Sequence, residues 1–403
     1  MYGLVLEGGG GKGGYHIGVW KALRELNIEI GAVTGSSTGA LNGAFIAQNA
    51  FEKAYDLWYN MDTSLVINVD TEIYNNLINF TFDYKNRDKY FDYVKSVLKD
   101  RGLDIEPLKE LIKLNLDEEL IRNSSIEFGL VTVSITDRKP LELFVDEIPV
   151  GKLHDYLLAS AYLPTFKSMV IDNKKFIDGA FYDNLPINLI YKRGYKNIIA
   201  VEMKSLGLKR SVKAKDINII TIEPSGDLGM VLEFDAEKSR KNIQMGYLDT
   251  LKVFGKYEGD KYFFENVPDE SYFISYLLNL RDEQINEMAM EIGLPEGSSK
   301  RLLFEGIIPE FAKLFGVDMQ YSYKDIVIRF FEHLALRLEV ERLKVYSFEQ
   351  FKDIIFEKTE SVDTNIIDHH KIPSFLKKTY LVKYSLKEDI LLKWAKIIVR
   401  LDK

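Results

Sequence analysis

Two glycine-rich turns near the N-terminus have residue types suited to acyl transfer. Residues 35–39 read Gly-Ser-Ser-Thr-Gly and fit the pattern G-x-S-x-G, with Ser37 at its centre and Gly35 and Gly39 at its ends. In that pattern a sharp turn between a strand and a helix exposes the central hydroxyl as a nucleophile. Residues 8–13 read Gly-Gly-Gly-Gly-Lys-Gly and offer unhindered backbone N–H groups at a helix start, where negative charge is favoured. Acyl transfer requires a nucleophile beside a site that stabilises an oxyanion, and these two turns together predict both.

The glycine run is interpreted as an oxyanion hole formed by backbone amides of Gly8, Gly9, Gly10, Gly11 and Gly13. It fails as a Walker-type loop, because Lys12 is followed by glycine and not by Ser or Thr. It fits the spacing of a dinucleotide fingerprint, but the next strand ends in the serine turn, where that fold would place a ribose-binding carboxylate. A nucleotide-binding regulatory protein therefore stays as one alternative, and a catalytically silent scaffold as another.

A serine nucleophile needs a base, and Asp178 is the better candidate. It follows an apolar run, at the expected end of a strand, and is followed by Gly179 and Ala180. None of the histidines stands out by its context: His16, His154, His333, His369 and His370. The chain order Ser37, Asp178 and a late histidine nevertheless leaves a Ser–Asp–His α/β-hydrolase esterase open.

The elements that would position these residues alternate between strand and helix. Strands are expected near 4–6, 32–34, 128–133, 141–145, 175–177, 197–201 and 217–222, and helices near 16–26, 38–59, 90–98, 108–114 and 152–161. This alternation predicts a three-layer α/β domain with a mainly parallel central sheet. We place this catalytic domain at residues 1–225.

The pattern from about residue 235 onward is almost wholly helical. Helices are expected near 236–254, 284–292, 300–315, 323–343 and 385–401. Residues 226–403 are therefore assigned to a mostly helical C-terminal region. The boundary is soft, since the first of these helices could pack on the catalytic domain.

Composition narrows the classes of partner. The 403 residues carry a net charge of −8, which argues against nucleic acid as a partner and against capture by anionic lipid through bulk charge. The absence of cysteine excludes thiolate chemistry. No secretory signal or transmembrane stretch is recognised, so a cytoplasmic location is expected.

Three ordered blocks of this sequence resemble the signature of the patatin-like phospholipases. They are residues 6–13, residues 35–40 and the Asp-Gly-Ala at 178–180, and residues 159–164 and 182–186 match segments that flank the last block. The resemblance covers about residues 1–205. Two departures are Ala180, where glycine is commoner, and Glu7, where aspartate is commoner.

This resemblance implies a lipid acyl hydrolase of the phospholipase A or lysophospholipase type. It implies a Ser37–Asp178 dyad, an oxyanion hole in the glycine loop and an acyl-enzyme intermediate, with no metal or cofactor. The expected substrate is a phospholipid or another acyl-ester lipid, with transient contact to a membrane surface. Oligomeric state, head-group preference and the role of the C-terminal region stay open.

Overall fold

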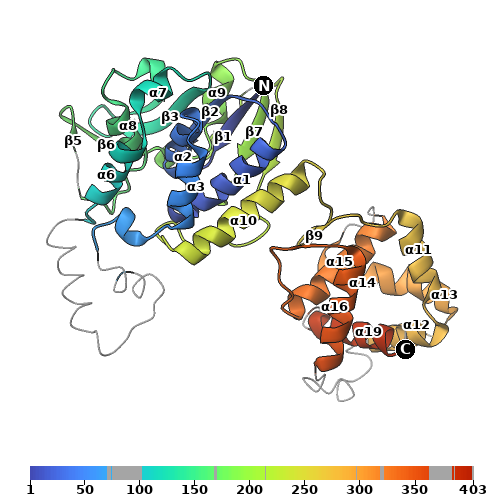
Figure 1. Cartoon of the computed structure of the whole chain (residues 1–403). Coiled ribbons are helices and arrows are strands. Elements are labelled where there is room, and N and C mark those ends of the chain that lie inside the picture. The colour runs from blue at the N-terminus through green and yellow to red at the C-terminus, as the bar shows by residue number, and fades with distance from the viewer. Residues whose placement is uncertain are drawn as a thin grey trace, which may run out of the picture. The chain divides into compact units, whose positions relative to one another are not determined.

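The protein forms two compact units, which Figure 1 shows and which are described separately here. Unit 1 is Met1–Phe254 and unit 2 is Gly255–Lys403. The computed structural model describes residues 1–69, 74, 102–167, 170–213, 215–295, 297–317, 322–362, 384 and 386–401. The helix expected near 90–98, His369 and His370 lie outside these residues. Within them, no helix combines the length and the apolar character needed to cross a membrane.

Unit 1 is built on an eight-stranded mixed sheet. Its strands are β1 (Tyr2–Leu6), β2 (Ile30–Ser36), β3 (Glu127–Ser134), β4 (Lys139–Phe144), β5 (Val170–Ile171), β6 (Lys174–Asp178), β7 (Asn197–Val201) and β8 (Asn218–Ile222). The order is β5-β6-β3-β2-β1-β7-β8, with β4 also paired to β3. The run from β8 to β3 is parallel, whereas the pairs of β3 with β4, β3 with β6 and β5 with β6 are antiparallel. The prediction of a mainly parallel sheet is confirmed.

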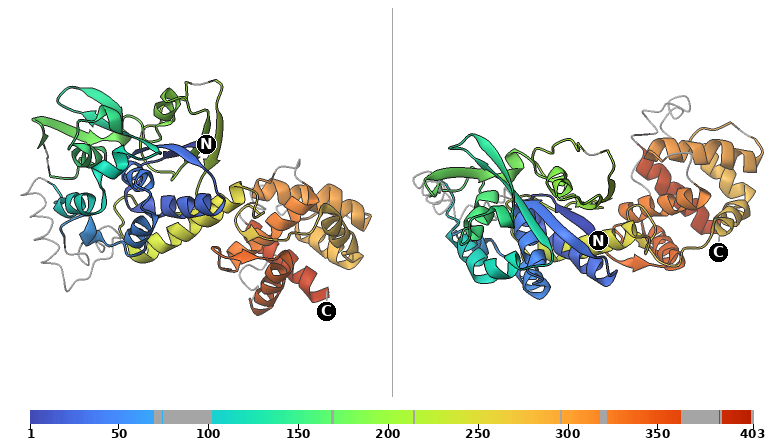
Figure 2. Two further views of the ribbon diagram at one scale, coloured as in Figure 1. Left: turned by 45° about the horizontal axis from the view of Figure 1, so that its top comes forward. Right: turned by 90° about the horizontal axis from the view of Figure 1, so that it is seen from above.

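Helices cover both faces of this sheet, as the two views in Figure 2 show. They are α1 (Gly14–Glu25), α2 (Thr38–Ala47), α3 (Phe51–Tyr59), α6 (Glu106–Asn115), α7 (Glu118–Arg122), α8 (Leu153–Ser160), α9 (Ile187–Lys192) and α10 (Ala236–Val253). Side chains alternate between the two faces of each strand, and on one face Val5 packs in a cluster with Ile190 of α9. On the other face Val33 and Phe128 approach Gly43 of α2. The three-layer α/β architecture is confirmed.

The single helix expected over 38–59 is two helices. After α2 the chain reaches Asn49, whose φ of 55° is left-handed and cannot continue an α-helix. The chain resumes as α3 at Phe51. The apolar pattern continues through the break, which is why periodicity alone predicted one element.

Helix α10 belongs to unit 1. Two glycines let it cross α1 closely: a side chain at Gly18 would clash with the Ile243 backbone, and one at Gly246 with the Tyr15 backbone. Asp249 of α10 also accepts a hydrogen bond from the Tyr15 hydroxyl at 3.1 Å. The boundary was expected at residue 225 with the provision that this helix could pack on the catalytic domain, and the structure divides the chain after Phe254.

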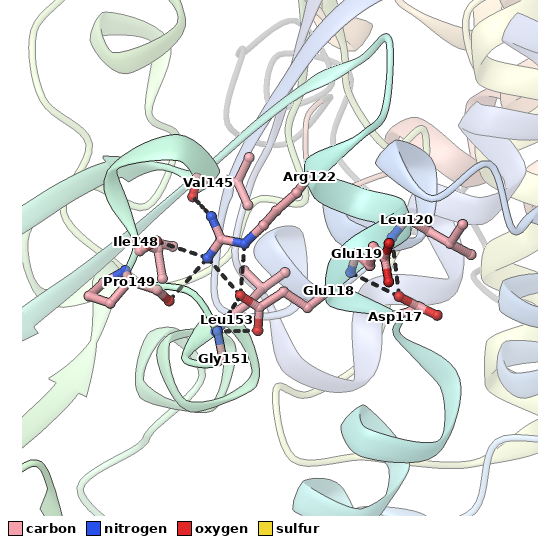
Figure 3. A network of polar contacts seen from close by, with 10 residues as sticks. All are labelled: Asp117, Glu118, Glu119, Leu120, Arg122, Val145, Ile148, Pro149, Gly151 and Leu153. Carbon is pink, nitrogen blue, oxygen red and sulfur yellow. Dashed lines mark hydrogen bonds and ion pairs between the residues drawn. The ribbon is translucent and has the colours of Figure 1, made fainter.

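A partly buried ion pair anchors the segment that leads into α8 (Figure 3). Arg122 and Glu118 of α7 lie 2.6 Å apart, with 18% and 15% of their side chains exposed. The guanidinium donates to the carbonyls of Val145, Ile148 and Pro149, and the Glu118 carboxylate accepts from the amides of Gly151 and Leu153. The backbone of the loop thus provides hydrogen-bond partners for both the guanidinium and the carboxylate. These bonds fix the position at which α8 begins.

Unit 2 is mostly helical. It contains α11 (Glu270–Asn279), α12 (Asp282–Glu291), α13 (Ser299–Leu302), a π-helical turn (Leu303–Ile307), α14 (Ile308–Phe315), α15 (Tyr323–Arg337), α16 (Phe348–Ser361) and α19 (Lys387–Leu401). The helix expected over 323–343 ends early, since Glu339 adopts a φ of 52°. Two short parallel strands, β9 (Phe263–Phe264) and β10 (Val345–Tyr346), were not expected. The core includes Phe273, Phe331 and Trp394, all fully or almost fully buried.

Candidate active site

Ser37 occupies a strained turn between β2 and α2. Its φ of 55° and ψ of −129° are unusual for a residue other than glycine. Its side chain borders a pocket, while Ser36 is fully buried with its hydroxyl close to Gly179. The structure therefore offers the Ser37 hydroxyl, and not that of Ser36, to a bound molecule.

Gly35 and Gly39 are required by close approach of the backbone at this turn. A side chain at Gly35 would clash with the backbone of Gly39, and one at Gly39 would clash with the carbonyl of Leu6 in β1. The two glycines thus let α2 begin directly against the end of the sheet. This packing brings the serine turn next to the glycine loop that follows β1.

The backbone of Ser37 is held by a side chain from α8. Ser37 N–H donates to Ser160 Oγ at 3.0 Å, and the Ser160 hydroxyl donates to the Val131 carbonyl at 2.7 Å. Ser160 is fully buried. It was noted in the sequence only as part of a flanking segment, and its contact with the serine turn was not anticipated.

Asp178 reaches the same region by a route that the sequence did not predict. It was expected at the carboxyl end of a parallel strand, but β6 is antiparallel to β3. Asp178, the last residue of β6, therefore pairs with Thr132 of β3. The residue before Thr132 is Val131, which pairs with Ser36 of β2. The carboxylate lies near Ser37 because β6 runs toward the serine turn and ends there.

The environment of Asp178 favours a carboxylate that can take up a proton. It is fully buried, and Oδ1 accepts the amide of Ala180 at 2.7 Å. Among the described residues, none donates a well-formed hydrogen bond to Oδ2. Burial raises the pKa of Asp178 to about 6, against the lowering effect of the Ser37 hydroxyl and the Ala180 amide.

Within the described part of the chain, two amides of the glycine loop have no backbone acceptor. Gly8 N–H donates to the Asn184 carbonyl at 3.1 Å and Gly11 N–H to the Val231 carbonyl at 2.8 Å, while Gly13 lies in the 3₁₀-helix Gly10–Gly13. The amides of Gly9 and Gly10 have no acceptor among the residues that the structure describes. Of the five predicted donors, these two are available to an oxyanion.

Residues 231–233 limit the space over this loop. Gly10 has a φ of +56°, and a side chain there would clash with the Val231 carbonyl; one at Gly11 would clash with the Glu233 carbonyl. Two carbonyl oxygens thus face the loop at positions where a phosphate-binding loop presents amides to its ligand. This arrangement does not suit a nucleotide.

Asn184 and a buried carboxylate connect the glycine loop to the Asp178 segment. Asn184 Nδ2 donates to the Gly8 carbonyl at 3.1 Å and contacts Glu7 Oε1 at 3.4 Å. Glu7 is fully buried, accepts the Met203 amide and pairs with Lys209 at 3.1 Å. A buried carboxylate needs this kind of compensation. Glu7 stands where aspartate is commoner in the resembled family, and its charge is paired with Lys209 in the loop after β7.

The pocket beside Ser37 is lined mainly by apolar side chains. Its lining includes Leu41 and Phe45 of α2, Leu57 and Trp58 of α3, Leu108 and Leu111 of α6, Leu163, Phe166, Leu232 and Phe234. The polar atoms near it are already paired: Trp58 Nε1 donates to Asn42 Oδ1 at 2.8 Å, and Thr38 Oγ1 donates to the Gly10 carbonyl at 3.0 Å. The pocket therefore offers an apolar surface directly beside Ser37.

The histidines of unit 1 have other surroundings. His16 is buried beside Asn42, 3.2 Å from its amide nitrogen, and burial lowers the pKa of His16 to about 3. His154 contacts the Leu116 carbonyl at 2.8 Å. Neither makes a hydrogen bond with Asp178, whose contacts are described above. In unit 2, burial among aromatic rings lowers the pKa of His333 to about 4.

Comparison with known proteins identifies one family for the N-terminal part of the chain. The family model described as patatin-like phospholipase matches residues 4–191. Patatin-like phospholipase domain-containing protein ZK370.4 of Caenorhabditis elegans is 26% identical over 51% of this chain and 14% of its own length. Human patatin-like phospholipase domain-containing protein 6 is 29% identical over 50% of this chain and 13% of its own length.

Lysophospholipase NTE1 of Candida glabrata is 26% identical over 53% of this chain and 11% of its own length. The similarity with these relatives thus spans about half of this chain and only a small fraction of each relative. The match to the family model, residues 4–191, covers the glycine loop, the serine turn and the Asp178 segment.

Proposed function

We propose that unit 1, whose residues 4–191 match the patatin-like phospholipase family model, hydrolyses carboxylic esters of lipids in the manner of a phospholipase A or lysophospholipase. The observation that carries this proposal is that the strained Ser37 lines an apolar pocket and lies near the buried carboxyl group of Asp178. The names of the relatives, which include phospholipases and a lysophospholipase, support the same reaction class.

In the first half of the reaction, Ser37 Oγ attacks the acyl carbonyl carbon and its proton passes to Asp178 Oδ2. The Ala180 amide holds the other carboxylate oxygen and so orients the acid. The tetrahedral intermediate then expels the alcohol, which takes the proton from Asp178. The products of this half are an acyl ester on Ser37 and the freed alcohol, for example a lysophospholipid.

In the second half, water attacks the acyl-enzyme and gives its proton to Asp178. The intermediate breaks down to the carboxylic acid, and Ser37 recovers its hydroxyl. In both halves the amides of Gly9 and Gly10 would donate to the negatively charged oxygen. One such donor contributes roughly 3–4 kcal/mol of transition-state stabilisation.

The apolar pocket would hold the acyl chain while the ester lies at Ser37. Leu41 and Phe45 extend along α2 from the turn that carries Ser37, so the chain would lie against this helix. Burial of a hydrocarbon chain gives about 0.8 kcal/mol per methylene group. The structure thus supports substrates with an acyl chain over small water-soluble esters.

The test is hydrolysis of a lysophospholipid and of a short-chain p-nitrophenyl ester by the purified full chain. Wild-type protein should release fatty acid and p-nitrophenol, and Ser37→Ala should release neither. Ser36→Ala is the matched control, since its buried hydroxyl accepts and donates no hydrogen bond among the described residues. Activity that survives Ser37→Ala, or that is lost only in Ser36→Ala, would contradict the proposal.

A further inference from the structure

An exposed loop after β7 combines basic and apolar side chains beside the candidate active site. We call residues 203–213 the basic–apolar loop; they read Met-Lys-Ser-Leu-Gly-Leu-Lys-Arg-Ser-Val-Lys, with four cations and no acid. Leu206 is 90% exposed, Leu208 62% and Val212 39%. Such a composition contrasts with the net charge of −8 of the whole chain. Exposed apolar side chains among cations are typical of segments that contact lipid surfaces.

The loop is held against the segment that follows Asp178. Leu208 N–H donates to the Ala180 carbonyl at 2.9 Å, and Asn184 N–H donates to the Leu208 carbonyl at 2.6 Å. Farther along, the Asn188 side chain donates to the Ser211 carbonyl and accepts from the Lys213 amide, both at 3.0 Å. The backbone is thus engaged on the protein side while the Leu206 and Leu208 side chains remain in solvent.

The loop also adjoins the other half of the site. A side chain at Gly9 would meet the end of Met203 and the hydroxyl of Ser205. Phe181, half exposed, lies in the 3₁₀-helix Gly179–Phe181 directly after Asp178. The exposed apolar residues are therefore next to both the oxyanion loop and the Asp178 turn.

Among the described residues, two of the four cations form no ion pair, although the charge of Arg210 acts on the nearby Asp183 carboxyl group. Lys204 pairs with Glu223 at 3.1 Å, and Lys209 pairs with Glu202 and Glu7. Arg210 lies over the ring of Tyr182, 4.4 Å from its centre. Lys213 makes no ion pair within the described part of the chain. Arg210 and Lys213 are therefore available to external negative charge.

We propose that the basic–apolar loop docks unit 1 on the surface of an anionic lipid bilayer. Leu206, Leu208 and Phe181 would enter the interfacial region while Arg210 and Lys213 contact lipid phosphates. This inference rests on the proposed function, because docking there brings the ester-hydrolysing site to its substrate. The positive charge and the exposed apolar side chains of this loop favour binding to an anionic bilayer, whereas the net charge of the whole chain opposes it.

The test is cosedimentation of the full-length Ser37→Ala protein, which leaves the lipid intact, with vesicles. Vesicles of phosphatidylglycerol and phosphatidylcholine in equal parts are compared with vesicles of phosphatidylcholine alone. Binding should be about tenfold stronger to the anionic vesicles and should weaken as salt is added. Equal binding to both kinds of vesicle, or none to either, would overturn the inference.

Matched variants locate the surface. Leu206→Ser with Leu208→Ser should weaken vesicle binding about tenfold. The control pair is Leu114→Ser with Val150→Ser, two apolar residues of unit 1 with similar exposure, 79% and 85%. Lys213→Glu should also weaken binding, whereas Lys53→Glu on α3 should not. Equal losses in test and control variants would overturn the inference, and melting temperatures of all variants verify that they are folded.

Failure of this inference is separable from failure of the proposed function. Hydrolysis of a water-soluble p-nitrophenyl ester by wild-type protein, without vesicles, reports on the dyad alone. Esterase activity without vesicle binding would overturn the docking surface and leave the proposed function standing. Vesicle binding through the loop without esterase activity would support the docking surface and contradict the function.

Discussion

The hydroxyl of Ser160 accepts a hydrogen bond from the backbone N–H of Ser37, 123 residues earlier in the chain. The same hydroxyl donates to the Val131 carbonyl of β3. A buried side chain of α8 therefore links the serine turn to the strand beside it. Ser160 touches no reacting atom in the proposed mechanism, and we interpret it as a positioning residue.

Ser160→Ala should remove the hydroxyl that accepts from the buried Ser37 amide and donates to the Val131 carbonyl. We expect a loss of about 1–3 kcal/mol in the free energy of unfolding. We also expect kcat to fall about tenfold with little change in KM, because a small displacement of the nucleophile is costly. Ser239→Ala is the control, since this buried hydroxyl donates to the Trp58 carbonyl and not to the turn. Equal kinetic effects from both variants would contradict a positioning role.

Asp178→Asn should abolish turnover and stabilise the protein at neutral pH. The variant keeps an acceptor for the Ala180 amide but removes the base, so kcat should fall by orders of magnitude. Burial in the folded protein raises the pKa of Asp178 from 3.8 to about 6. Keeping the carboxylate ionised at pH 7 thus costs up to about 3 kcal/mol, which the neutral amide avoids.

The sign of this effect follows from linkage. Because the folded-state pKa is raised, the stability that Asp178 contributes is fully present below pH 3.8 and is lost as the pH rises through about 6. Denaturant unfolding should therefore show a stabilised variant at pH 7 and a difference near zero at pH 4. For wild-type protein, kcat/KM should rise with pH through about 6. A variant less stable than wild type at pH 7 would contradict the burial argument.

Gly10→Ala should damage the site through the backbone. The added Cβ would clash with the Val231 carbonyl and would also meet a φ of +56°. We expect turnover to fall about a hundredfold as the proposed donors move. Gly194→Ala shares a positive φ but has open space around it, so it should lose about 1 kcal/mol of stability and retain its activity. Comparable activity in the two variants would argue against the oxyanion assignment.

Arg122→Ala should test the ion pair in Figure 3. It removes donors to three loop carbonyls and leaves Glu118 unpaired, so we expect unfolding to become easier by about 2–3 kcal/mol. Lys241→Ala, which breaks an exposed pair with Glu237, should cost less than about 0.5 kcal/mol. Urea denaturation of both variants measures the difference.

The sequence predicted those parts of the site that depend on local pattern. The turn around Ser37 needs small residues at fixed offsets, and a strand–turn–helix context was visible within about twenty residues on either side. Asp178 was identified with its strand and its glycine. The three-layer architecture followed from alternation of strand and helix, because each strand is short and apolar and each helix has its own periodicity.

Features that depend on distant residues were not predictable. The direction of β6 relative to β3 is set by the connection through β5, and the contacts of Ser160 and Val231 with the site join segments far apart in the chain. The packing of α10 on α1 depends on Gly18 and Gly246, which in sequence are only glycines in helices. Helix α11 was missed because its apolar and aromatic residues follow one another closely. Helix α16 buries Phe348, Phe351 and Ile355 at helical spacing, so its pattern could have been recognised.

Covalent labelling tests the central claim most directly. Full-length protein is treated with a fluorophosphonate, digested, and analysed by mass spectrometry to locate the modified residue. The proposed mechanism predicts one adduct on Ser37, formed rapidly in wild type and at least about a hundredfold more slowly in Asp178→Asn. A folded protein that forms no adduct, or that is modified at Ser36 or at another residue instead, would contradict the assignment of Ser37 as the nucleophile.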